Sequence, residues 1–263
     1  MGKNSNLSSS KKQRLEREKA EAEALEKQKK QNRILLFTFC GILALALIGL
    51  GIGIGVSAIK NKKRQENMVE GAIVDPVNTS YTSSSEITDL VRLTVRYTDE
   101  NDVYRQGEII VKLNASVAPI TVANFQKLVS EKFYDGLTFH RIYAGFMIQG
   151  GDPDGNGTGG SDETIKGEFS ANGVQNSLSH KRGVISMARS SVSYDSASSQ
   201  FFIMHAANTG LDGQYAAFGE VVSGMDTVDG IAGTEVKYNS SGEKSSPVNP
   251  VTIVSAEFVT QAG

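Results

Sequence analysis

One uncharged apolar run, Ile34 to Val56, divides this chain of 263 residues into two unequal parts. As a helix rising 1.5 Å per residue, the run would extend about 34 Å, which exceeds the roughly 30 Å of a bilayer's hydrocarbon core. A helix of this length that is apolar on every face is rarely buried in a soluble domain. The run therefore predicts a transmembrane anchor over residues 34–56.

Basic residues flank this run on both sides, so the immediate flanks set its orientation only weakly. Residues 1–33 nevertheless carry more Lys and Arg than the segment that follows the run. We therefore expect a single-pass protein of the cell membrane, with the N-terminal tail in the cytoplasm and the C-terminal domain outside. The alternative is a signal peptide cleaved after Val56-Ser57-Ala58, although the polar leader and the apolar run are both long for one.

The composition of the remaining segments predicts a tail, a linker and a folded domain. Residues 1–33 are polar with charges of both signs, which is typical of a solvated tail. Residues 57–87 are rich in Ser, Thr and Asn and are predicted to form a flexible linker. Residues 88–263 then form the folded domain. The net charge of −2 gives no reason to expect a nucleic-acid partner, and the single cysteine, Cys40, excludes an intrachain disulfide.

Short apolar stretches recur throughout residues 88–263 and predict β-strands. In the clearest of them, every second residue from Val91 to Tyr97 is apolar or aromatic and would face one side of a sheet. Helices are expected from Pro119 and around 228–231. Further strands are expected at 107–113, 137–141, 146–149, 184–188, 201–204, 217–222 and 251–258. Many short strands with few helices favour a mainly β fold and a closed barrel.

The stretch from Phe139 to Asp152, FHRIYAGFMIQGGD, places one cation, Arg141, among apolar and aromatic residues. Burying a guanidinium is costly unless its donors are used, and its planar fork can hold a polar target in one geometry. The alternative is an ordinary edge strand in which Arg141 reaches water. The glycine-rich run 151–160 that follows lacks the Lys-Ser/Thr ending of a phosphate loop, so nucleotide binding is not expected.

Three further motifs favour a functional site: GVISMAR at 183–189, SQFFIM at 199–204 and LDGQYAAFGE at 211–220. In this order and at these separations, together with FHRIYAGFMIQGGD, they closely resemble the cyclophilin family of peptidyl-prolyl cis–trans isomerases. The resemblance extends from about Leu93 to about Phe258. It implies an eight-stranded antiparallel barrel with a helix over each end. It also implies an enzyme that accelerates rotation about X–Pro bonds in flexible polypeptides, without a cofactor or a metal.

The resemblance assigns roles to individual residues. Arg141 would donate a hydrogen bond to the prolyl nitrogen, which becomes basic only when the peptide bond twists. Apolar side chains would line a proline pocket, and Gln149 would hold Arg141 and the substrate carbonyl. The predicted catalytic residues are Arg141, Phe146, Gln149 and Phe202. The predicted substrate-binding residues are His140, Met147, Ala188, Arg189, Gln200, Leu211 and Tyr215.

For Arg189 and His140 the sequence predicts a more specific role. Arg189, with Ala188, would act through its backbone on the residue before the proline. His140 is expected to be a structural, hydrogen-bonded histidine, because a proton shuttle has no task in this reaction. His180 and His205 stand alone and lack metal-ligand spacing.

The sequence departs from the best-known eukaryotic pattern at two positions around the pocket. Gly210 stands where a tryptophan is typical, and Tyr215 stands where a histidine is typical. Tyr215 can still flank the pocket, whereas Gly210 removes a wall and a ring N–H donor. The sequence therefore predicts that cyclosporin binds only weakly.

Three functions are considered from the sequence, and one of them, a structural anchor whose barrel only docks a partner, would leave the pocket chemistry unexplained. The first is a membrane-anchored prolyl isomerase that assists the folding of exported proteins. The second is a membrane-tethered chaperone or scaffold that captures Pro-containing segments, with turnover incidental. The presence of Arg141, Phe146, Gln149 and Phe202 favours the first.

Overall fold

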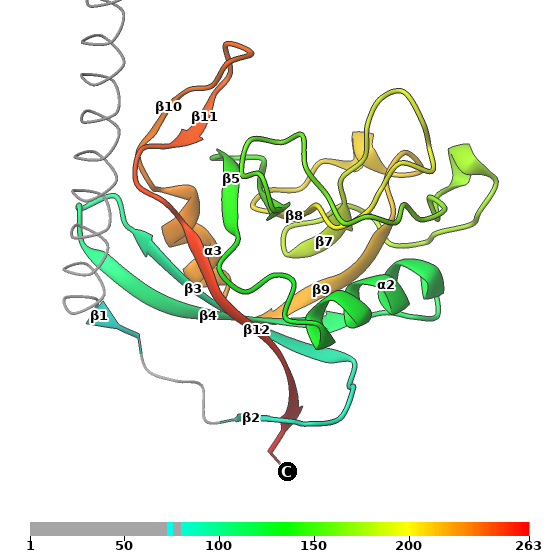
Figure 1. Cartoon of the computed structure of the whole chain (residues 1–263), viewed down its shortest axis with the longest axis horizontal. Helices are drawn as coiled ribbons and strands as arrows, with labels where there is room; N and C mark the ends of the chain where they lie inside the picture. The colour runs from blue at the N-terminus through cyan, green and yellow to red at the C-terminus, as the bar shows by residue number, and fades with distance from the viewer. Residues whose placement is uncertain (1–72, 76–79, 263) are drawn as a thin grey trace, which may run out of the picture. The chain divides into compact units, whose positions relative to one another are not determined.

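The computed structural model describes residues 73–75 and 80–262 of the chain. Its main feature is a closed, eight-stranded antiparallel barrel, as the sequence predicts. The neighbours run in the order β4, β3, β12, β5, β6, β8, β7 and β9, and the pairing of β9 with β4 closes the barrel (Figure 1). The barrel strands are β3 (Leu90–Thr98), β4 (Tyr104–Leu113), β5 (Thr138–Tyr143), β6 (Met147–Asp152), β7 (Val184–Met187), β8 (Phe201–Met204), β9 (Ala217–Ser223) and β12 (Thr252–Gln261).

Two short strands lie outside the closed barrel and change the expected domain boundary. β1 (Ile73–Val74) pairs in parallel with β4, and β2 (Tyr81–Ser83) pairs antiparallel with β12. Both strands fall inside residues 57–87, which the sequence assigns to a flexible linker. The folded part of the chain therefore reaches further toward the N-terminus than residue 88.

The alternating pattern of β3 correctly predicts its buried face but not the surroundings of its polar face. Val91, Val95 and Tyr97 are buried in the barrel interior, with Leu93 beside them. On the opposite face Arg92 is only 7% exposed, because β2 and the neighbouring strands cover it. Its guanidinium donates to the Tyr81 carbonyl at 2.6 Å and pairs with the Glu257 and Glu108 carboxylates at 3.3 and 3.5 Å.

Two α-helices pack against the barrel. α2 (Pro119–Ser130) places Phe125 against Phe218 of β9, with ring centroids 5.2 Å apart. α3 (Met225–Ala232) lies against β3, where Gly230 is required because an added Cβ would meet the Tyr97 hydroxyl at 2.6 Å and the ring at 2.7 Å. Figure 1 shows the two helices well separated around the barrel. Two 3-10 turns, η1 (Ser170–Asn172) and η2 (Thr209–Leu211), lie in the loops.

A hairpin absent from the sequence prediction follows α3. It consists of β10 (Val236–Tyr238) and β11 (Lys244–Pro247), which pair antiparallel in a separate two-stranded sheet. Figure 1 shows this hairpin, in orange, beside β5, and β11 is in contact with β5. The hairpin therefore brings residues near the C-terminus to the stretch that contains Arg141.

Strand alternation divides the apolar side chains between the barrel interior and the outer face. In β8, Phe201 belongs to the interior core and packs edge-to-face against Phe125 at 5.7 Å. The next residue, Phe202, belongs to a second apolar cluster, which also contains Met147 of β6. Ile148 follows Met147 and returns to the interior. Two neighbouring strands thus fill the core and supply apolar side chains to a site on the outer face.

No helix within 73–75 and 80–262 is long and apolar enough to cross a membrane. The predicted anchor, residues 34–56, lies outside the described residues, and so does the predicted tail, residues 1–33.

A carboxylate from a residue far along the sequence, Glu168, accepts hydrogen bonds from the first backbone N–H groups of α2. Ala118 at the cap position makes no side-chain capping bond, and Pro119 has no N–H to satisfy. The carboxylate of Glu168, 2% exposed, accepts from Ile120 N at 3.0 Å and from Thr121 N and Oγ1 at 2.7 Å. The negative charge also lies at the positive end of the helix dipole, which is a stabilising arrangement.

We expect Glu168→Gln to lower the free energy of unfolding by about 1–3 kcal/mol, because an amide replaces one acceptor with a donor that faces backbone N–H groups. Urea unfolding measures this change. The matched control is Glu163→Gln, whose ion pair with Lys127 has side chains 78% and 52% exposed. This control should cost less than about 0.5 kcal/mol. Equal losses in the two variants would contradict the capping role of Glu168.

Candidate active site

A cavity of about 480 Å³ opens beside the outer face of β5, β6 and β8. Every predicted site residue except Gln200 lines it. Gln200 lies next to the cavity and bonds to Gln149, which lines it. The structure thus brings together residues that the sequence places in four separate motifs.

The floor of the cavity is apolar. Met147 and Phe202 are 1% and 5% exposed, and Phe146, Leu211 and Tyr215 pack against the cluster to which they belong. The rings of Phe202 and Tyr215 meet edge-to-face with centroids 5.7 Å apart. This arrangement offers an aromatic and aliphatic surface to a small apolar ring such as that of proline.

His180 supports this apolar floor. The sequence alone does not reveal this role of His180. Its ring is fully buried and stacks on Phe202, with centroids 6.0 Å apart and an interplanar angle of 18°. Its Nδ1 bonds to Asp212 at 2.8 Å and its Nε2 to Ser186 at 3.0 Å. Burial lowers the pKa of His180, although the Asp212 carboxylate opposes the shift. His180 therefore fixes the plane of Phe202 from behind.

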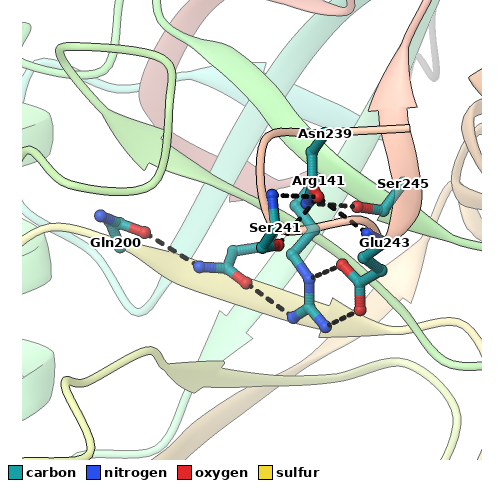
Figure 2. A network of polar contacts seen from close by, with 7 residues as sticks. Arg141, Gln200, Asn239, Ser241, Glu243 and Ser245 are labelled. Atoms are coloured by element: carbon teal, nitrogen blue, oxygen red, sulfur yellow. Dashed lines mark hydrogen bonds and ion pairs between the residues drawn. The ribbon is translucent and has the colours of Figure 1, made fainter. Parts of the chain in front are cut away.

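Arg141 and Arg189 are the two cations among the described residues that line the cavity. Three hydrogen bonds fix the guanidinium of Arg141 (Figure 2). Nε donates to Glu243 Oε2 at 2.6 Å and Nη2 to Glu243 Oε1 at 2.7 Å. Nη1 donates to Gln149 Oε1 at 3.2 Å, as the sequence predicts. A guanidinium has five N–H groups, so one on Nη1 and one on Nη2 have no partner among the described residues.

The polar network continues from Gln149 to the glycine-rich loop. Gln149 Nε2 donates to Gln200 Oε1 at 2.9 Å (Figure 2). Gln200 Nε2 in turn donates to the carbonyls of Gly157 and Gly159 at 3.2 and 2.7 Å. Hydrogen bonds at both the Oε1 and the Nε2 of Gln149 therefore fix the orientation of its side-chain amide.

Sequence reasoning missed Glu243, the ion-pair partner of Arg141. Glu243 lies just before β11, in a segment for which no element was predicted. The side chains of Arg141 and Glu243 are 33% and 29% exposed. The hydrogen bond from Arg141 is the main cause that lowers the pKa of Glu243 to about 2, and the same hydrogen bond raises the pKa of Arg141. A turn sequence, NSSG at 239–242, was the available signal for the hairpin, but nothing in it points to Arg141.

His140 differs from its prediction as a hydrogen-bonded histidine. Both ring nitrogens are buried, and neither has a hydrogen-bond partner within the described residues. Burial, together with the nearby Arg141 charge, lowers the pKa of His140 despite the opposing Asp152 carboxylate, so the ring is neutral at pH 7. His140 therefore lines the cavity while both of its ring nitrogens remain buried.

The backbone role assigned to Arg189 stays a prediction, and the structure adds a role for its side chain. Its guanidinium lies 4.9 Å from the ring centroids of Tyr194 and Tyr215 and 5.4 Å from that of Phe169. Its Nε donates to the Gln214 carbonyl at 3.0 Å. The side chain therefore forms a cation–π wall of the cavity. Ala188 lies beside it and donates its backbone N–H to the Gln200 carbonyl at 2.9 Å.

Within the described ranges, no three His, Cys, Asp or Glu side chains are placed to hold a metal ion. The arrangement instead combines an apolar floor with fixed, uncharged amides and one paired guanidinium. Such a site can bind an apolar ring and direct a hydrogen-bond donor at an atom beside it.

A closed antiparallel barrel with this site on its outer face defines a protein of the prolyl isomerase class. Residues 96–258 match the family described as "Cyclophilin type peptidyl-prolyl cis-trans isomerase/CLD". The chain belongs to the cyclophilin family and is a peptidyl-prolyl cis–trans isomerase.

Named relatives agree with this assignment. The chain is 44% identical over 130 residues to peptidyl-prolyl cis-trans isomerase B of Bacillus subtilis, covering 49% of this chain and 87% of that protein. It is 37% identical over 161 residues to a peptidyl-prolyl cis-trans isomerase of Helicobacter pylori, covering 60% and 91%.

A solved structure agrees as well. A cyclophilin type peptidyl-prolyl cis-trans isomerase of Cryptosporidium parvum, crystallised in the presence of the dipeptide Ala-Pro, superposes with a TM-score of 0.51. It is 27% identical, and the match covers 64% of this chain and 99% of that chain.

Proposed function

We propose that Arg141 catalyses rotation about X–Pro bonds by donating a hydrogen bond to the prolyl nitrogen of a twisted peptide bond. The observation that carries the proposal is that Arg141, which keeps two N–H groups without a partner among the described residues, lines the same cavity as Met147 and Phe202. The floor would take the proline ring, and the guanidinium would then lie beside the nitrogen of that ring.

The physical basis is the resonance of the amide. Resonance gives the bond a rotation barrier of roughly 18–20 kcal/mol, and uncatalysed exchange at X–Pro takes tens to hundreds of seconds. Twisting removes the resonance and leaves a lone pair on nitrogen. A fixed donor binds that lone pair in the twisted form and finds no such acceptor in either planar form, so it lowers the barrier.

The neighbouring residues would hold the substrate on either side of the proline. Gln149 is fixed between Arg141 and Gln200, so its amide would also grip the substrate carbonyl. Arg189 and Tyr215 would form the wall beside the residue before the proline. The substrate class is then an unfolded or flexible polypeptide that contains proline, and the Cryptosporidium relative was crystallised in the presence of a small peptide with one X–Pro bond, Ala-Pro.

For the whole chain we propose a membrane-anchored isomerase that assists the folding of exported proteins. The uncharged run from Ile34 to Val56 supports the anchor, and the larger number of Lys and Arg in residues 1–33 supports a cytoplasmic N-terminus.

Protease added to intact cells should degrade the barrel and spare the N-terminal tail, because this topology exposes only the barrel. Detection of both ends with separate antibodies measures the result, and lysed cells, in which both ends are cleaved, serve as the control. A mature protein that begins at Ile59 would show cleavage and exclude the anchor. A barrel that is cut only after lysis would contradict the orientation.

Cyclosporin is expected to bind weakly, because the cavity lacks a large side chain at Gly210. This glycine is exposed within η2, and an added Cβ would meet only Asn208 Oδ1, at 3.1 Å. A small shift of the Asn208 side chain would admit Gly210→Trp, which should tighten cyclosporin binding, as measured by titration calorimetry. If the parent chain already binds cyclosporin as tightly as the variant, this interpretation of Gly210 is wrong.

Arg141→Ala should lower kcat/KM for a Pro-containing peptide about a hundredfold or more, since roughly 3 kcal/mol of transition-state stabilisation is lost. Peptide affinity should fall much less, because the apolar floor supplies most of the binding. Phe202→Ala should show the reverse, with weaker binding. Exchange spectroscopy measures the isomerisation rate, and an unchanged thermal midpoint verifies folding.

The matched control for this experiment is Arg182→Ala. Arg182 forms an exposed ion pair with Asp229 and does not line the cavity, so its removal should leave the isomerisation rate unchanged. A folded Arg141→Ala variant that isomerises at the parent rate would contradict the catalytic assignment. The chain would then act as a module that captures Pro-containing segments.

A further inference from the structure

We propose that Glu243, on the β10–β11 hairpin, is a positioning residue for the isomerisation: it fixes the plane of the Arg141 guanidinium so that the two free N–H groups face the cavity. The inference rests on the proposed function of Arg141. It adds a second residue to the reaction, contributed by a hairpin that lies outside the barrel.

The geometry of the ion pair restricts the guanidinium in two directions. Glu243 accepts from Nε and Nη2 at 2.6 and 2.7 Å, a bidentate pairing that defines the guanidinium plane. Gln149 accepts from Nη1 at 3.2 Å on another edge. A guanidinium held by Gln149 alone could still rotate about its side-chain bonds, whereas these three contacts leave one orientation.

Glu243 acts from behind the arginine and does not contact the cavity. Arg141 and Gln149 both line the cavity, and so do Asn239 and Ser240 of the hairpin turn, but Glu243 does not. Its carboxylate occupies the guanidinium edge remote from Gln149 (Figure 2). A substrate would therefore meet the free N–H groups of Arg141 without displacing the carboxylate, which argues against an inhibitory role for Glu243.

The hairpin fixes the carboxylate before any substrate arrives. Asn239 Oδ1 accepts from the backbone N–H groups of Ser241 and Glu243 at 3.0 and 2.9 Å (Figure 2). Gly242 adopts φ 81°, a left-handed conformation that a glycine takes without strain. Ser245 is fully buried, and its hydroxyl accepts a hydrogen bond from Asn239 Nδ2 at 3.3 Å (Figure 2). The turn therefore holds Glu243 with the precision that a catalytic support requires.

The pairing also balances charge at a half-buried position. A guanidinium that is one-third exposed beside an apolar floor loses part of its hydration. The carboxylate replaces that hydration with two charge-assisted hydrogen bonds. The low pKa of Glu243 means that it remains ionised throughout the neutral and mildly acidic range, so the support is permanent under ordinary conditions.

The test uses the full-length chain and the variant Glu243→Gln. The amide retains the shape of the carboxylate but turns an NH2 donor toward the guanidinium donors, so at most one of the two hydrogen bonds survives. We expect kcat/KM for a Pro-containing peptide to fall about tenfold, mainly through kcat. KM should stay within about twofold, because Glu243 does not contact the cavity. Glu243→Asp should recover part of the loss, since it keeps the charge.

Glu235→Gln is the matched control, because Glu235 carries the same charge change just before β10 and is exposed. Its activity should equal that of the parent. The decisive readout is the double variant Arg141→Ala with Glu243→Gln. If Glu243 acts through Arg141, the second substitution causes no further loss once the guanidinium is gone.

Three results would overturn the inference. Parent activity in a folded Glu243→Gln variant would show that the guanidinium needs no such support. Higher activity would show that the carboxylate competes with substrate. An equal loss in the presence and absence of Arg141 would show a general structural role. Failure of the proposed function is distinct from all three, because it would appear as parent activity in Arg141→Ala itself.

Discussion

A guanidinium beside an apolar hollow is the constraint on which this site depends. Such a group is stable there only if fixed partners replace the water it loses, and those partners must leave part of it free to act. Glu243 and Gln149 meet both requirements for Arg141. The contacts extend through Gln200, just before β8, to the glycine-rich loop, so the hairpin, strands β5 and β6 and the loop form one hydrogen-bonded unit.

The barrel supplies the apolar half of the site through simple strand alternation. Phe201 and Ile148 point into the core, while their neighbours Phe202 and Met147 form the cavity floor. The pairing of β6 with β8 holds the two floor residues together, and the pairing of β6 with β5 places Arg141 beside that floor. His180 adds a buried support beneath Phe202, held by Asp212 and Ser186. Rigid elements thus position both the apolar and the polar groups.

The sequence predicts the parts of this structure that depend on local patterns. The alternation around Leu93, the helix that begins at Pro119 and the motif that carries Arg141 and Gln149 all have local signals, and the structure agrees with each. The pairing of Arg141 with Glu243 joins residues far apart in the chain, and neither hydrophobic period nor residue type links them. The burial of Arg92 under β2 and the stacking of Arg189 on three aromatic rings are also tertiary contacts, which only the fold reveals.

The central claim is that Glu243 holds Arg141 as an ion pair in the absence of substrate. Nuclear magnetic resonance titration of the Glu243 side-chain carboxyl carbon tests it most directly, with Glu243→Gln used to assign the signal. With the ion pair formed, the pKa of Glu243 should be about 2, so the signal stays at its ionised position as the pH is lowered through the ordinary value of 4.5. In Arg141→Ala the pKa should rise toward that ordinary value. A Glu243 carboxyl that titrates near 4.5 in the parent chain would contradict the account.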